Sequence, residues 1–123
     1  MNKHDKAELI NHLLQYITEN KREKMHAVLE NRTRYVTVVL EDLFQPHNAS
    51  AALRTCDIFG VQDVHVVENQ YKFKAVPTIA MGASKWVDVY SYSSITDSIA
   101  ALKAQGYRIV ATTPHRQSMP RRA

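Results

Sequence analysis

The sequence has 123 residues, of which 45% are apolar and 23% charged, and its formal net charge is +4. This length is typical of one domain. No apolar run approaches the roughly 18 residues of a membrane span, and the N-terminus lacks the apolar segment of a secretory signal. The single cysteine, Cys56, has no partner, and no Cys/His spacing predicts a metal site. We therefore expect a cytoplasmic protein with no membrane partner.

The charges are unevenly distributed. Basic residues outnumber acidic ones in residues 1–40 and 91–123, whereas acidic residues outnumber basic ones in residues 41–90. Basic ends suit a polyanionic partner, because each neutralised phosphate releases counterions. Charge alone leaves open the alternative of a mildly basic protein without such a partner.

Residues 1–32 predict a small helical extension ahead of a unit formed by residues 33–123. A helix is expected over residues 5–19, with Asp5 as its cap and apolar residues at helical spacing. A second start signal at Asn20 predicts another short helix.

From residue 35 onward, strand and helix patterns alternate. The expected elements are strands over 35–40, 64–67, 86–90 and 107–111 and helices over 47–59 and 94–105. The strands are β-branched runs with few charges, as in strands buried on both faces, and a glycine ends each helix. This order predicts an α/β fold with a Rossmann-like, mostly parallel sheet, whose ligands bind beyond the carboxyl ends of the strands.

The chemically richest segment, QPHNASAALRTCDIFG, follows the first expected strand and opens the first helix of this sheet. Asn48 lies in the first helical turn, where its amide can cap backbone N–H groups. His47 and Arg54 are seven residues apart and share a helix face. This placement predicts a site at the carboxyl end of the strand.

The same residues also have an ordinary structural interpretation, which the sequence leaves open. Asn48 would then be only a cap, and Arg54 would pair with Asp57 or Asp42. Cys56 lies on the apolar stripe of the helix and is interpreted as a core residue. The single tryptophan and the six tyrosines are interpreted as packing residues and not as platforms for nucleobases.

The segment PHNASAALRTCDIFGVQDVHVVE resembles the first signature motif of the SpoU/TrmH family. These proteins are S-adenosylmethionine-dependent RNA ribose 2′-O-methyltransferases with a C-terminal trefoil knot. The shared features are the asparagine, the arginine six residues later, the Thr-Cys-Asp after it and the Phe-Gly-Val that ends the helix. VTVVLEDL, GASKWVDV and YRIVATT are similar to the tRNA branch of that family, so the resemblance covers roughly residues 32–114.

The resemblance implies methylation of a ribose in RNA, with a tRNA guanosine as the expected target, S-adenosylmethionine as cosubstrate and a homodimer as the full-length enzyme. Arg54 matches the catalytic arginine of the family and Asn48 its motif asparagine. Thr112, after the last expected strand, is the candidate contact to the methyl donor. The candidate RNA contacts are Arg32, Arg34, Lys85 and His47.

The chemistry requires a ribose 2′-hydroxyl to lose its proton while it attacks a sulfonium methyl group. In the family model the arginine accepts that proton with help from a substrate phosphate. Because the pKa of a guanidinium group exceeds about 12, a second role is easier to defend. Arg54 would hold the phosphate through two parallel hydrogen bonds and stabilise the developing alkoxide.

The sequence departs from the family in lacking its second and third motifs, a glycine-containing loop and a Ser-Leu-Asn-type turn with a helix. We therefore expect a chain that is truncated before the knot and before most of the donor site, and inactive alone. A non-catalytic RNA-binding fragment is the alternative. A generic Rossmann-like domain for small molecules is disfavoured, since the chain has no glycine-rich phosphate loop.

Overall fold

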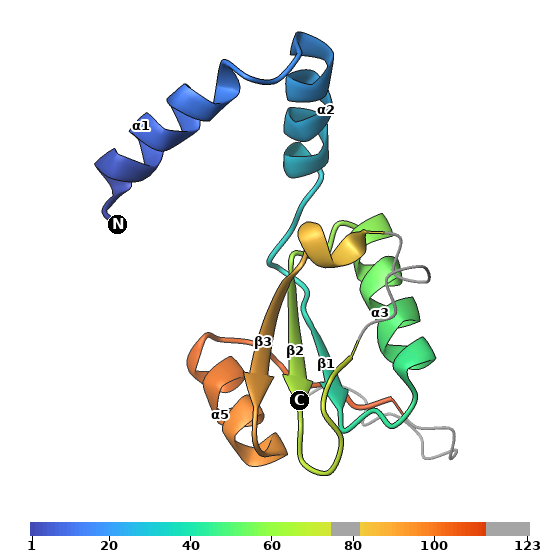
Figure 1. Ribbon diagram of the computed structural model, residues 1–123. Coiled ribbons are helices and arrows are strands. Elements are labelled where there is room, and N and C mark those ends of the chain that lie inside the picture. The colour runs from blue at the N-terminus through green and yellow to red at the C-terminus, as the bar shows by residue number, and fades with distance from the viewer. Residues whose placement is uncertain (75–81, 113–123) are drawn as a thin grey trace.

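The computed structural model describes residues 1–74 and 82–112 and contains one parallel sheet flanked by helices (Figure 1). In chain order the elements are α1 (Lys3–Leu14), α2 (Glu19–Glu30), β1 (Val38–Glu41), α3 (Pro46–Ile58), β2 (Asp63–Val67), η1 (Ala83–Lys85), β3 (Asp88–Tyr92) and α5 (Ile95–Ala104). The predicted α/β fold with a parallel sheet is confirmed. No helix in the described part is long and apolar enough to cross a membrane.

The sheet has the order β1-β2-β3, and both strand pairs are parallel. In the central strand, Val64 pairs in register with Val38 on one side and with Val89 on the other. All five residues of β2 are buried, so both faces of the sheet are covered at its centre. Because the strands are parallel, they all end at one edge, which we call the carboxyl edge, and begin at the opposite amino edge.

The core lies between α3 and one face of the sheet. Its buried members are Leu53, Cys56, Val64, Val66, Ala83 and Val87. Alternate residues of a strand point to opposite faces, so Val64 and Val66 reach α3 together. Cys56 is confirmed as a core residue, and burial raises the pKa of its thiol.

Helix α5 packs against β2 and β3 on the other face of the sheet (Figure 1). Leu102 and Ser98 are its fully buried residues. On this face His65 stacks on Tyr90 with ring centroids 5.1 Å apart, and burial lowers the pKa of the imidazole. The chain therefore passes from the α3 face of the sheet to the opposite face after β3.

The strand expected over residues 107–111 does not form, so this prediction is wrong for the described chain. These residues have no regular secondary structure. The Tyr107 N–H closes the end of α5 by donating to the Leu102 carbonyl at 3.1 Å, and its hydroxyl donates to the carbonyl of Arg34, ahead of β1. The segment thus returns towards β1. A β-branched run becomes a strand only when it finds a ladder partner.

Two expected strands are displaced by two or three residues. β1 begins at Val38 and not at Tyr35, and β3 begins at Asp88 and not at Trp86. The backbone N–H groups of Trp86 and Val87 donate to the Ala83 carbonyl and close a 3-10 turn. Because Trp86 and Val87 are large and apolar, the sequence pattern includes them in the strand, whereas in the structure they close the turn that precedes it.

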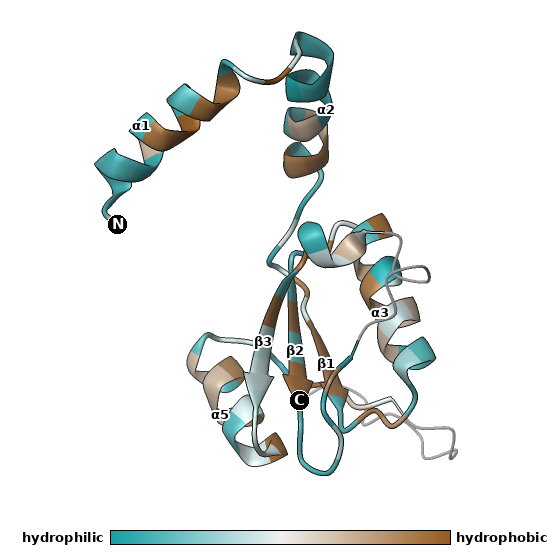
Figure 2. Ribbon diagram, viewed as in Figure 1, coloured by the Kyte–Doolittle hydropathy of each residue, from teal (hydrophilic) through white to brown (hydrophobic). Residues whose placement is uncertain are grey.

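The N-terminal extension consists of two helices, α1 and α2, which carry both hydrophilic and hydrophobic residues (Figure 2). Neither helix buries a residue. The cap of α1 is Asn2 and not Asp5, which instead occupies the third helical position of a capping box. The helix ends at Leu14, five residues earlier than expected. A separate cap, Thr18, starts α2. Exposed large apolar residues of the extension are Leu9, Ile10, Leu13, Tyr16, Met25 and Leu29.

Gly60 joins the extension to the α/β unit. Its φ angle is +74°, and a side chain there would overlap the carbonyl oxygen of Asn31. The Gly60 carbonyl also accepts a hydrogen bond from the Thr33 N–H at 2.8 Å. This position therefore needs glycine for both its backbone conformation and the close approach of another chain segment.

We predict that Gly60→Ala lowers the free energy of unfolding by about 3 kcal/mol or more, from left-handed strain plus steric overlap. The matched control is Gly106→Ala, where φ is +90° but nothing lies within 4 Å of the added carbon. That variant should lose only about 1–2 kcal/mol. Urea denaturation followed by circular dichroism measures both. Equal losses would show that the contact with Asn31 is unimportant.

Candidate functional site

The start of α3 lies at the carboxyl edge, directly after β1. Gln45 is the N-cap residue, without a side-chain capping bond, and Pro46 occupies the first helical turn. Asn48 is the third residue of the helix, and its backbone N–H donates to the Gln45 carbonyl at 3.0 Å. Its side chain is exposed and makes no hydrogen bond to residues 1–74 or 82–112. The prediction that the Asn48 amide caps the helix is therefore wrong, and this amide is available to a ligand.

Arg54 is exposed on α3, two turns beyond His47 on the same flank. Within the described ranges its guanidinium has no hydrogen bond or ion pair. Both acids that the structural interpretation offered it are engaged elsewhere: Asp57 pairs with Arg32, and Asp42 accepts two backbone N–H groups. The ordinary interpretation of Arg54 as an internal ion-pair partner is therefore wrong.

Two of the candidate RNA contacts are held by internal carboxylates. The Arg32 side chain is only 8% exposed and forms an ion pair with Asp57, whose carbonyl it also approaches at 3.4 Å. Arg34 donates from Nε to Asp63 at 3.0 Å and from Nη2 to Asp88 at 3.2 Å. The nearby Asp63 carboxylate raises the pKa of Arg34. Both arginines precede β1 and thus lie at the amino edge.

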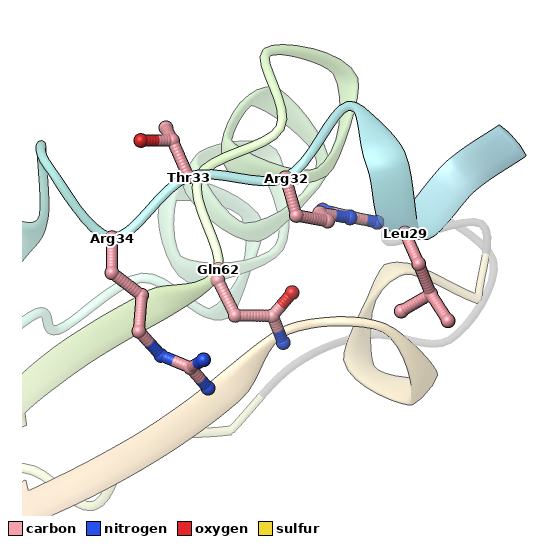
Figure 3. A pocket seen from close by; sticks show the side chains of 5 residues that line it. All are labelled: Leu29, Arg32, Thr33, Arg34 and Gln62. Carbon is pink, nitrogen blue, oxygen red and sulfur yellow. The ribbon is translucent and has the colours of Figure 1, made fainter. Parts of the chain in front are cut away.

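An open groove of about 450 Å³ lies at this amino edge (Figure 3). Its lining residues are Leu29, Arg32, Thr33, Arg34 and Gln62. The two guanidinium groups face three carboxylates through the ion pairs described above. The Gln62 amide is also engaged, since it donates to the Trp86 carbonyl at 2.8 Å. Because its positive charge is already compensated, this groove is poorly suited to a phosphate.

The remaining candidates are exposed but do not form one cluster. Lys85 ends η1, which precedes β3 and therefore lies at the amino edge. His47 lies at the opposite edge, at the start of α3, and Thr112 is the last residue before the C-terminal segment outside the described ranges. The two edges are separated by about 15 Å, the length of the five-residue strand β2.

A clamp between two loops at the carboxyl edge was not predicted from the sequence. Asp42 has a φ angle of +48°, and one of its carboxylate oxygens accepts the N–H groups of Gln70 and Tyr71, each at 2.8 Å. Its own N–H donates to the Val67 carbonyl at 2.9 Å. An acid at the end of a strand is the only sequence signal for this clamp, since its partners are 28 and 29 residues away.

The same two loops share an aromatic contact. The rings of Phe44 and Tyr71 meet edge to face, with centroids 4.9 Å apart and an interplanar angle of 61°. Phe44 precedes α3 by two residues and Tyr71 follows β2 by four. The clamp and this ring pair together fix the loop that leads from β1 into α3.

The described fold is that of a parallel α/β domain with exposed polar side chains on the helix after its first strand, as in domains that bind ligands beyond the carboxyl ends of their strands. Residues 35–122 match the model of the SpoU rRNA Methylase family. Since this match spans most of the sequence, the chain belongs to that family, which confirms the resemblance noted in the sequence.

Several known proteins are similar to the chain. The tRNA (guanosine(18)-2′-O)-methyltransferase of Borreliella burgdorferi is 42% identical over 107 residues, and that of Escherichia coli K12 is 39% identical over 85 residues. The crystal structure of the A. aeolicus TrmH/SpoU tRNA modifying enzyme is similar with a TM-score of 0.65 and 28% identity, over 72% of this chain and 45% of that one.

The chain spans only part of these relatives. The matches cover 87% of it but 49% of the Borreliella protein, and 69% of it but 37% of the Escherichia protein. The shared part includes the helix that carries Asn48 and Arg54.

We predict that Arg32→Ala destabilises the fold, because it leaves the Asp57 carboxylate without its partner. The expected loss in the free energy of unfolding is about 2 kcal/mol, below that of a fully buried pair because the Asp57 side chain is 27% exposed. The control is Lys85→Ala, which removes an exposed cation without a partner in the described ranges and should change stability by less than about 0.5 kcal/mol. Urea titrations that show the same small change in both variants would contradict the structural role of Arg32.

Proposed function

We propose that this protein acts in the S-adenosylmethionine-dependent 2′-O-methylation of a ribose in RNA, with a tRNA guanosine as the target. The observation that carries the proposal is the exposed guanidinium of Arg54, together with the exposed amide of Asn48, on the helix that follows β1, neither of which has a partner among residues 1–74 and 82–112. Support comes from the family match and from relatives named tRNA (guanosine(18)-2′-O)-methyltransferase.

Arg54 acts in this proposal on the sugar-phosphate of the substrate. Its planar guanidinium offers two parallel N–H groups to a phosphate, with a geometry that an ammonium group lacks. The cation also stabilises negative charge on the 2′-oxygen as the hydroxyl proton leaves. His47 and Asn48, towards the carboxyl edge from Arg54, contact neighbouring parts of the RNA. Arg32 and Arg34 contribute at most secondary contacts, since both are already paired, whereas the exposed Lys85 contacts the RNA from the amino edge.

The methyl donor of this proposal is S-adenosylmethionine, which supplies an electrophilic methyl group when bound. Thr112 is the candidate contact among the described residues, and it is exposed. The groove at the amino edge and a second open groove of about 290 Å³ beside Tyr35 and Tyr107 are both lined by other residues.

A second candidate is a non-catalytic RNA-binding role, which the exposed side chains of Asn48 and Arg54 on α3 would support without a methyl donor. The chain would then keep the free side chains of α3 and bind RNA without methylating it. For the full-length enzyme we propose a homodimer in the cytoplasm without a membrane partner. We also propose that residues 1–32 form a separate extension, which is supported by the absence of buried residues in α1 and α2.

Two measurements test these proposals. The full-length enzyme, incubated with tRNA and donor labelled in the methyl group, should give labelled tRNA, and alkaline hydrolysis should leave one resistant dinucleotide, because a methylated 2′-oxygen cannot attack the adjacent phosphate. Calorimetry of the 123-residue chain with donor alone, and then with tRNA alone, separates the two candidates. Donor binding and transfer support the enzyme, whereas tRNA binding without donor binding supports the RNA-binding role. Absence of any tRNA binding contradicts both.

We predict that Arg54→Gln weakens tRNA binding about tenfold, through the loss of a charge-assisted phosphate contact. Arg54→Lys keeps the charge but not the planar fork, so it should bind more tightly than Arg54→Gln while methyl transfer falls by about 100-fold or more. Filter binding at fixed salt and the labelling assay measure these effects. Lys103→Gln, which removes an exposed positive charge from α5, is the matched control and should bind tRNA like the wild type. Equal affinities for Arg54→Gln and Lys103→Gln would exclude the contact.

A further inference from the structure

The aromatic pair at the carboxyl edge has no role in the chemistry described so far. Phe44 is 65% exposed and Tyr71 is 40% exposed, although the two rings contact each other. Phe73, two residues further along the same loop, packs against the core. The loop after β2 therefore directs the ring of Phe73 inwards and that of Tyr71 outwards. Together with Phe44 on the loop after β1, Tyr71 exposes an apolar face to water, which is unfavourable unless something covers it.

These rings are held in place by an unusual backbone arrangement. Asp42 adopts a left-handed conformation that costs a residue other than glycine about 1 kcal/mol or more. In return, its carboxylate accepts the N–H of Tyr71 itself and that of Gln70. Phe44 lies two residues after Asp42 in the chain. The clamp restrains the backbone at Tyr71 and the ring contact restrains the two side chains, so less conformational entropy remains to be lost when a flat ligand binds.

Basic side chains adjoin the pair and are at most weakly paired. Lys72 follows Tyr71, and its side chain is 80% exposed in a surface pair with Glu68 at 3.4 Å, which is weak enough to exchange for a phosphate. Lys74 is exposed and has no partner in the described ranges, and the His47 imidazole is exposed three residues after Phe44. One oxygen of the Asp42 carboxylate accepts two backbone N–H groups, and no ion pair joins that carboxylate to either lysine within the described residues.

We propose that Phe44 and Tyr71 form a stacking platform for one unpaired nucleobase of the RNA substrate. Rigid aromatic faces beside lysines are the combination by which proteins bind single-stranded nucleic acid, because every base has a stacking face and every phosphate a charge. The platform rests on the proposed function, in that it assumes RNA as the ligand. It adds a contact at the exit of β1, next to the helix that carries Asn48 and Arg54.

The test uses a stem-loop RNA with 2-aminopurine at single loop positions, because the fluorescence of this base changes when it stacks. A fully paired duplex of the same length is the second probe. The wild-type chain should bind the stem-loop with a fluorescence change at one loop position. Phe44→Leu and Tyr71→Leu should each weaken stem-loop binding about tenfold and remove that change, while duplex binding stays within twofold.

Two further variants act as controls. Tyr71→Phe keeps the ring and should keep wild-type affinity. Tyr35→Leu removes an aromatic side chain that is 90% exposed ahead of β1, at the other edge, and should also bind as the wild type. Circular dichroism checks that each variant folds.

The outcomes separate the platform from the function on which it rests. If Phe44→Leu and Tyr71→Leu bind the stem-loop as tightly as Tyr35→Leu, the platform is wrong while RNA binding stands. A loss that is equal for stem-loop and duplex also overturns it, because duplex bases cannot reach the rings. If the wild-type chain binds neither RNA, the proposed function fails and the platform fails with it.

Discussion

The parallel pairing of β2 with a strand on each side is the constraint on which the rest of the structure depends. A strand with all five residues buried must be covered on both faces, and α3 and α5 provide that cover. Parallel pairing also brings the ends of β1, β2 and β3 to one edge. The loops after β1 and β2 therefore become neighbours there, although they are nearly thirty residues apart in sequence.

The two edges of the sheet use their charged residues in opposite ways. At the amino edge, Arg32 and Arg34, which precede β1, form ion pairs with acidic residues of α3, β2 and β3. These ion pairs hold the first strand against its neighbours and compensate the charge of both arginines, although Lys85 at the same edge is exposed and has no partner in the described ranges. At the carboxyl edge and along α3, the side chains of His47, Asn48 and Arg54 make no hydrogen bond or ion pair within residues 1–74 and 82–112. The described residues thus pair the two arginines ahead of β1 internally and leave the polar groups of α3 available to a ligand.

The sequence was sufficient to predict the layered fold, because the buried run around Val64 and the apolar stripe of α3 are local patterns with a clear period. It also directed attention to Arg54. It did not predict that Arg32 is neutralised, since Asp57 lies 25 residues away and only the fold brings the two together. The strand expected after Gly106 failed for a related reason, because strand formation depends on a partner that a local pattern does not contain. The tyrosines were grouped as packing residues, but Tyr71 differs from the others because Asp42 fixes its backbone.

In the proposed function, RNA binds at the carboxyl edge and along the exposed side of α3, and not in the open groove of the amino edge. Amide hydrogen exchange of the 123-residue chain, with and without tRNA, tests it most directly. The expected result is slower exchange in residues 42–48 and 68–72 and little change in residues 32–35 and 61–62. Protection confined to the amino-edge segments would contradict the claim and would make Arg32 and Arg34 the RNA contacts after all.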